Sequence, residues 1–264
     1  MAERIGLEPW LWLGGSLLLA LVATWTAWGL ERAKGRNPRI ASVLDGPFYP
    51  LFVEVGRLLF YLGLPAAALL WGRDAVVGRL MGFQSLLLLN GLVGDPAPAG
   101  DIAANLADWM RDVGWAVGLG TAAWAVLALG WWTVRRGAAP LRLDSGPLSG
   151  IVGLREAAYH EVHWAFYRNA PIVALGPYWG TWAGLGLVAL EAVLNPFWRA
   201  SLGDADRASL PLLRAGMAFV SAALFLKTGN LWLAVLVHWG VLWGLSATAN
   251  SGLTTETQRA QRNP

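Results

Sequence analysis

Residues 9–30 read P-W-L-W-L-G-G-S-L-L-L-A-L-V-A-T-W-T-A-W-G-L, a stretch without a charged side chain. A transmembrane helix needs about 20 apolar residues to cross the hydrocarbon layer. The stretch is too long for the apolar part of a secretory signal peptide, and no small-residue cleavage site follows it. We therefore expect an uncleaved first transmembrane helix here.

The whole chain has the composition of an integral membrane protein. Its 264 residues are 56% hydrophobic and 14% charged, whereas a soluble domain carries about 25% charged residues. The 17 tryptophans and 32 glycines agree, because Trp gathers at membrane interfaces and Gly is common where membrane helices pack closely. Cysteine is absent, which excludes disulfides, thiolate catalysis and cysteine-ligated metals. The net charge of +3 indicates membrane orientation through arginine-rich loops and no nucleic-acid surface.

Further apolar stretches predict an all-α, polytopic membrane helix bundle of about seven to eight hydrophobic helices. After the first span, they cover residues 51–72, 80–93, 113–134, 148–169, 171–194, 211–226 and 231–248. Residues 94–112 contain aspartates and prolines and are predicted to form a loop. No internal repeat divides the chain, so we expect one membrane domain over residues 1–264.

Arginine-rich loops orient the chain, because short loops rich in Lys and Arg stay in the cytoplasm. Loops 31–50 and 135–150 are both arginine-rich, so an even number of crossings should separate them. Because 80–93 is short for a span, we expect it to be re-entrant or interfacial. The connector 196–210 and a frayed tail after Gly252 are then cytoplasmic, and the protein is a multi-pass protein of the inner (plasma) membrane.

One predicted helix is rich in ionisable groups. Residues 155–168 read R-E-A-A-Y-H-E-V-H-W-A-F-Y-R and include two of the three histidines. Ionisable groups inside a membrane are costly and are usually retained for a function. Four side chains share one face of this helix: Glu156, His160, His163 and Tyr167. Glu161 and Arg168, seven apart, lie on an adjacent face.

A carboxylate beside imidazoles can take a proton from water as a general base, or can hold a histidine in one tautomer. We expect Glu161 to have such a function, because a buried carboxylate is the costlier group. Glu156 lies near the start of the helix and is expected to pair with Arg155 in a structural role. His238 lies in the last apolar stretch and is, taken alone, most easily interpreted as a packing residue.

Other polar residues lie in or near apolar stretches. Glu54 and Arg57 are three apart and are expected to pair on one helix face. Glu191 is either a member of a site or an end group that reaches the interface. Asn195 is predicted to cap the carboxyl end of the span 171–194.

Two segments resemble motifs of the CPBP family of intramembrane endopeptidases, which includes the CAAX prenyl proteases and bacteriocin-processing, Abi-type relatives. Residues 228–239, T-G-N-L-W-L-A-V-L-V-H-W, look like the family's T-G-S-L-W-x-A-I-x-x-H. In this resemblance His238 corresponds to the late histidine of the family. Residues 160–168, H-E-V-H-W-A-F-Y-R, look like a stretched form of E-E-x-x-x-R ending at Arg168. The resemblance covers about residues 148–250, a CPBP-like core that follows variable N-terminal helices in 1–140.

The chain departs from the family pattern at three places. It has no adjacent pair of glutamates, and Asn195 or Glu191 stands about where the family has the histidine of its second motif. Leu242 stands where the family has Asn or Asp.

The resemblance implies a glutamate-dependent intramembrane endopeptidase that acts on membrane-proximal or prenylated peptides. Glu161 then activates a water, His238 helps to stabilise the oxyanion, and His163 or His160 replaces the missing imidazole. The candidate catalytic set is Glu161, His238, His163, Arg168, Glu156, His160 and Asn195. No cofactor is implied.

The alternative function is a catalytically inactive scaffold or accessory subunit of a membrane complex, which the lost motif positions and the tryptophan content favour. Zinc held by the three histidines with a glutamate, and a haem or chlorophyll-type pigment on a histidine, are further alternatives. A transporter with a proton path is the last, and its candidate groups are Glu54, Arg57, Glu161 and Glu191. The lipid bilayer is the expected surrounding in every case.

Overall fold

The computed structural model describes residues 7–72, 81–82, 99–137, 150–204 and 207–262. These residues form helices and, within those ranges, no strand. Six of the helical segments are long and apolar enough to cross a membrane. The chain is therefore a multi-pass membrane protein with an all-α, polytopic fold, as the sequence predicted.

The spanning segments correspond to the predicted apolar stretches. They are α1 (Glu8–Lys34), α3, η1 and α4 together (Tyr49–Trp71), α6 (Ala99–Gly137), α7 (Gly150–Leu194), α9 (Ser209–Thr228) and α10 (Leu231–Arg262). Between 11% and 50% of the residues are buried in the most apolar part of each segment. Large apolar side chains such as Phe52 and Trp71 are instead 74% and 78% exposed. Helices that are solvated by lipid have this pattern, because lipid tails are as apolar as leucine.

Two helices extend beyond the boundaries that the sequence predicted. Residues 99–112 belong to α6 and are helical, so the predicted loop over 94–112 was wrong there. Helix α10 continues to Arg262 instead of fraying after Gly252. In both places hydropathy identified only the apolar part of a longer helix. The predicted re-entrant stretch 80–93 lies outside the described residues except for its positions 81 and 82.

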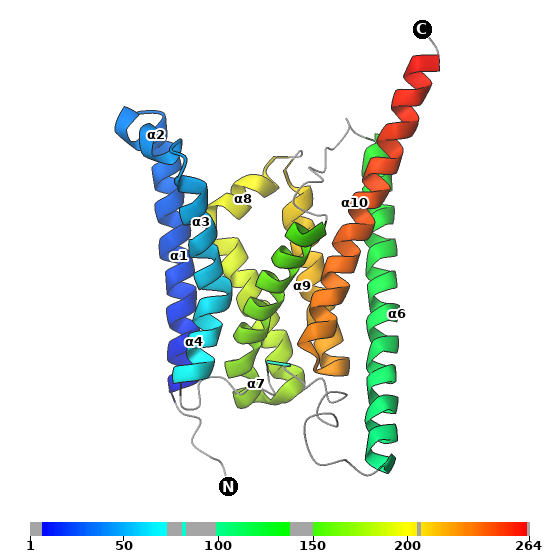
Figure 1. Cartoon of the computed structure of the whole chain (residues 1–264). Helices are drawn as coiled ribbons and strands as arrows, with labels where there is room; N and C mark the ends of the chain where they lie inside the picture. Colours follow the sequence, from blue (N-terminus) through cyan, green and yellow to red (C-terminus); the bar gives the residue numbers. More distant parts are fainter. Residues whose placement is uncertain (1–6, 73–80, 83–98, 138–149, 205–206, 263–264) are drawn as a thin grey trace. The chain divides into compact units, whose positions relative to one another are not determined.

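Helix α7 is a hairpin of two limbs, 150–175 and 177–194, as Figure 1 shows. Gly176 has φ 79° and ψ 169°, a conformation that glycine adopts without steric cost. Pro177 follows directly, and its fixed φ suits the first turn of a helix. The predicted break near residue 170 was wrong, because Pro171 lies inside the first limb and the chain turns only at Gly176.

The chain divides into two compact units, which we describe separately. Unit 1 consists of Met1–Met81 and Val162–Pro211, and unit 2 consists of Gly82–Glu161 and Leu212–Pro264. The expectation of a single membrane domain stays a prediction.

In unit 1, the two limbs of α7 pack closely because glycines line the second limb. A Cβ atom added to Gly184 would lie 2.6 Å from Cγ and 2.7 Å from Cα of Arg168. One added to Gly180 would collide with the backbone of Ile172. Small residues allow helix backbones to approach in this way inside membranes.

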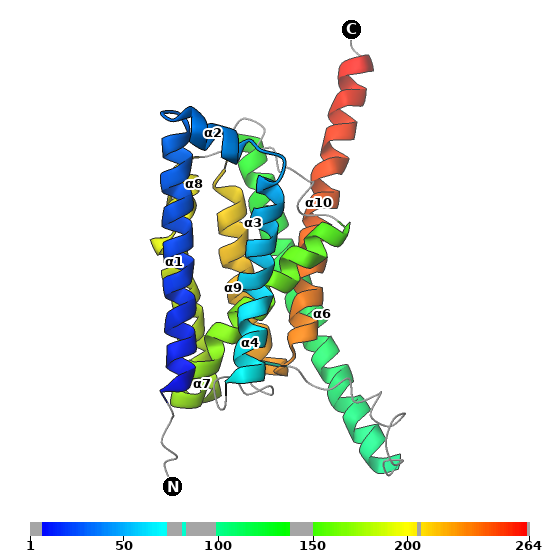
Figure 2. The same ribbon diagram turned by 60° about the vertical axis from the view of Figure 1, so that its left-hand side comes forward.

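Helix α1 contacts two short helices of unit 1, α2 (Pro38–Leu44) and α8 (Pro196–Leu202). Figure 2 shows α2 following directly on α1 before the chain enters α3. Lys34 Nζ lies 2.6 Å from Asp45 Oδ1. The Trp28 ring meets the Phe197 ring edge-on, with 5.0 Å between the centroids.

In unit 2, α9 and α10 form a tight hairpin whose turn explains the sequence T-G-N. Gly229 ends α9 with φ 57°, and its N–H donates to the Phe225 carbonyl at 2.7 Å. Asn230 begins α10, because its Oδ1 accepts from the backbone N–H groups of Trp232 and Leu233 at 2.9 and 3.2 Å. A left-handed glycine at a helix end and an asparagine at a helix start are the residues that these positions prefer.

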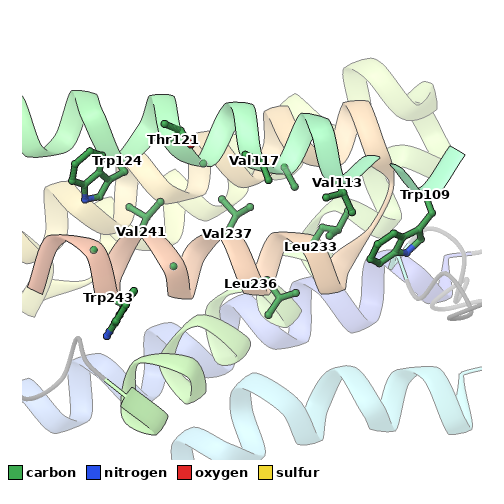
Figure 3. Close-up of a pocket in the computed structure, with 14 residues that line it drawn as sticks. Trp109, Val113, Val117, Thr121, Trp124, Leu233, Leu236, Val237, Val241 and Trp243 are labelled. Atoms are coloured by element: carbon green, nitrogen blue, oxygen red, sulfur yellow. The ribbon is translucent and has the colours of Figure 1, made fainter. Parts of the chain in front are cut away.

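Helix α6 packs along α10 in the same unit. A groove of about 560 Å³ lies between the two helices (Figure 3). Its lining is almost entirely apolar, with Trp109, Trp124 and Trp243 among its side chains and Gly120 and Gly244 on its walls. Its described lining includes the hydroxyl of Thr121 but no His, Asp, Glu, Lys or Arg side chain.

Candidate functional site

A buried glutamate stands at the centre of the polar cluster in unit 2. Glu161 is completely buried, and the side chains of His238 and Ser221 beside it are 2% and 1% exposed. His238 Nδ1 lies 2.9 Å from Glu161 Oε1, and the Ser221 hydroxyl donates to Glu161 Oε2. Both carboxylate oxygens therefore have a partner, as a buried charge requires.

Three helices bring these side chains together. Glu161 lies on the first limb of α7, Ser221 on α9 and His238 on α10. The α9–α10 turn fixes the position of His238 relative to Ser221. In addition, Trp239 Nε1, next to His238, donates to the carbonyl of Gly150 at 3.0 Å, which attaches α10 to the start of α7.

His160 is the third imidazole of the predicted set. Its Nδ1 lies 2.7 Å from the Glu156 carbonyl oxygen, one turn earlier in the same helix. The centroid of its ring lies 6.0 Å from that of His238. The ring of His160 therefore lies next to the Glu161–His238 pair.

The chain matches no protein-family model, no curated protein and no solved structure. These comparisons therefore assign no function to the chain.

The order of contacts around Glu161 decides which chemistry is open to the cluster. In a Ser-His-Asp triad the histidine lies between the serine and the carboxylate and takes the serine proton. Here the carboxylate lies between the histidine and the serine. The contacts of Glu161 therefore follow a different order from that of a triad, with the carboxylate at the centre.

The structure places the remaining predicted site residues elsewhere. Glu156 pairs with Arg155, with 3.4 Å between Oε1 and Nη2, as expected for a structural role. Arg168 is buried in unit 1 against Gly184. Asn195 follows the last residue of α7, and its N–H donates to the Glu191 carbonyl at 3.0 Å, as predicted for a cap at the carboxyl end of this helix. Its Oδ1 also caps the start of α8, since it accepts from the N–H groups of Phe197 and Trp198.

His163 belongs to a second polar cluster, in unit 1. Its Nε2 lies 2.9 Å from Glu191 Oε2, on the second limb of α7. The Tyr167 hydroxyl also hydrogen-bonds to Glu191. The Ser16 hydroxyl of α1 in turn donates to the Tyr167 hydroxyl at 3.4 Å. Glu191 is therefore a member of a buried polar cluster that is separate from the Glu161 cluster.

Sequence reasoning missed Ser221 and Ser16. Each is a small polar residue in an apolar helix, and each is at most 1% exposed. Such residues often form hydrogen bonds between membrane helices, which was the one available signal. In the described part of the chain, no group of three or more His, Asp or Glu side chains is placed to hold a metal ion, so the zinc hypothesis gains no support.

Proposed function

We propose that the protein is a glutamate-dependent intramembrane peptidase whose site is the Glu161–His238–Ser221 cluster. The observation that carries this proposal is the 2.9 Å contact between Glu161 Oε1 and His238 Nδ1. The two residues are 77 positions apart, and they come from the two segments that resemble CPBP motifs. A carboxylate held beside an imidazole supplies a base and a hydrogen-bond donor in one place.

Glu161 removes a proton from a water molecule, and the resulting hydroxide attacks the carbonyl carbon of the scissile peptide bond. The imidazole of His238 donates to the oxyanion that forms. The proton taken by Glu161 passes to the leaving nitrogen, which departs as an amine. Since both carboxylate oxygens already have a hydrogen-bonding partner, the Ser221 hydroxyl must give way to the water.

The substrate class follows from where the site lies. All three side chains belong to membrane-spanning segments, so a substrate has to enter from the bilayer or its interface. Membrane-proximal peptides and prenylated peptides meet this requirement. The arginine-rich loops favour an inner-membrane location with the C-terminal tail in the cytoplasm.

The test is cleavage by the full chain in proteoliposomes. The probes are fluorescent peptides with one transmembrane segment, with and without a prenylated cysteine at the end. Glu161→Gln is expected to reduce the cleavage rate by about 100-fold or more, the contribution of a general base. Ser221→Ala removes a positioning hydrogen bond and should keep measurable activity.

The scaffold function has one observation in its favour, which is that Glu161 is fully buried with both oxygens satisfied. Equal cleavage rates for wild type and Glu161→Gln would remove Glu161 from the mechanism. If the wild-type protein cleaves none of the probes and Glu161→Gln lowers its melting temperature, the cluster holds helices together and the scaffold function takes precedence.

A further inference from the structure

The His163 cluster of unit 1 is a second buried acid–base pair, which the proposed peptidase does not use. The side chains of His163 and Glu191 are 3% and 18% exposed. Their contact joins the two limbs of the α7 hairpin, 28 residues apart in the chain. Tyr167 and Ser16 continue the hydrogen-bonded chain from Glu191 to α1.

Aromatic rings surround the His163 imidazole. The ring centroids of Tyr167, Phe60 and Tyr61 lie 4.2, 4.9 and 5.2 Å from that of His163. His163 Nδ1 is buried and has no hydrogen-bond partner among the described residues. The imidazole of His163 therefore makes its contact with Glu191 within an aromatic environment.

The two neighbouring aromatic residues come from an unusual backbone. Phe60 and Tyr61 lie in η1 (Leu59–Gly63), a π-helical turn between α3 (Tyr49–Leu58) and α4 (Leu64–Trp71). Pro65 follows and lacks the N–H that an α-helix would use to bond the Tyr61 carbonyl. Single π-helical turns occur frequently at functional sites.

The charges around the pair decide how many protons it holds. A neutral imidazole beside a carboxylate would leave one net negative charge inside a membrane-spanning hairpin, which is costly. The titratable neighbours, Tyr61 and Tyr167, carry no positive charge that could offset it. The Arg57 guanidinium lies 5.9 Å from the Tyr61 ring, and its charge is balanced by Glu54, with which it pairs at 3.5 Å. One additional proton makes the His163–Glu191 pair neutral.

We propose that His163 and Glu191 together bind one exchangeable proton within the membrane-spanning part of unit 1. The proton is bound at neutral pH and is shared across the 2.9 Å contact between Nε2 and Oε2. Exchange takes place through Glu191, because its side chain is the more exposed of the two and lies three residues from the end of α7. The inference does not depend on the peptidase proposal.

The test reads the protonation of the ring nitrogens directly. The full chain is labelled with ¹⁵N-histidine, reconstituted in lipid nanodiscs and examined by NMR at pH 7. The chain has only three histidines, so His160→Gln and His238→Gln assign the signals of His163. We expect both His163 nitrogens to be protonated in the wild type. Glu191→Gln should remove this imidazolium signal, whereas Glu54→Gln, which changes another glutamate of unit 1, should leave it in place.

A neutral His163 in the wild type at pH 7 would overturn the proposal, and so would an imidazolium signal that persists in Glu191→Gln. If Glu191→Gln does not fold, the wild-type spectrum alone shows whether both ring nitrogens of His163 are protonated at pH 7. A second measurement uses thermal stability. Loss of the proton at high pH leaves a buried negative charge, so the melting temperature should fall as the pH rises, and it should fall less in Glu191→Gln.

Discussion

Replacing Gly180 with alanine is expected to keep the second limb of α7 from packing against the first. The added Cβ atom would collide with the Ile172 backbone, which cannot move aside as the end of a flexible side chain can. We expect a loss of about 3 kcal/mol or more in the free energy of unfolding, the upper range for overpacking. The measurement is thermal or SDS-induced unfolding of the purified protein, followed by tryptophan fluorescence.

Gly186→Ala is the matched control, because Gly186 lies on the same limb and has nothing within 4 Å of an added Cβ atom. Alanine in a helix is more favourable than glycine by roughly 0.5–1 kcal/mol, so this variant should be as stable as the wild type or slightly more stable. Equal stability of the two variants would mean that the limbs do not approach as closely as Gly180 and Gly184 indicate.

The second large effect is expected on replacing His238 with leucine. The substitution removes one of the two hydrogen-bonding partners of Glu161 and leaves the carboxylate buried beside an apolar side chain. Breaking a buried pair in this way costs about 3–5 kcal/mol. Leu236→Ala, at a position on the same helix that is 53% exposed, should change stability by less than about 0.5 kcal/mol.

A double substitution distinguishes the effect of breaking the Glu161–His238 pair on stability from the effect of changing side-chain volume. Glu161→Met combined with His238→Leu removes both polar groups and keeps similar side-chain volumes, which is often close to neutral. We therefore expect the double variant to be more stable than His238→Leu alone. If the two single effects simply add in the double variant, the residues do not interact in the folded protein.

Hydropathy was sufficient to predict the membrane-spanning segments because each of them contains a long apolar stretch. It failed where a helix continues into polar sequence, as at 99–112 and after Gly252. It also placed the break of α7 at the polar residues near 170, whereas backbone conformation places it at Gly176. A hydropathy pattern contains no information about the sign of φ.

The candidate site was only partly predictable. Glu161 was selected because it is an ionisable residue in a predicted membrane helix, and His238 because residues 228–239 resemble a CPBP motif. Ser221 was not found, because a single serine in a long apolar helix has no distinguishing spacing. Helix periodicity also grouped His163 with His160, although His163 hydrogen-bonds to Glu191 of the second α7 limb and His160 to a carbonyl of its own helix.

The turn at Gly229 and Asn230 also constrains membrane topology. Two residues are too few to carry the chain across a bilayer, so α9 and α10 must cross in opposite directions, and the far ends of both helices emerge in the same compartment. The residues before Ser209 and the helical extension up to Arg262 therefore face the same solution. Because the chain has no cysteine, one cysteine introduced at either end and probed with an impermeant reagent would determine the sidedness of both.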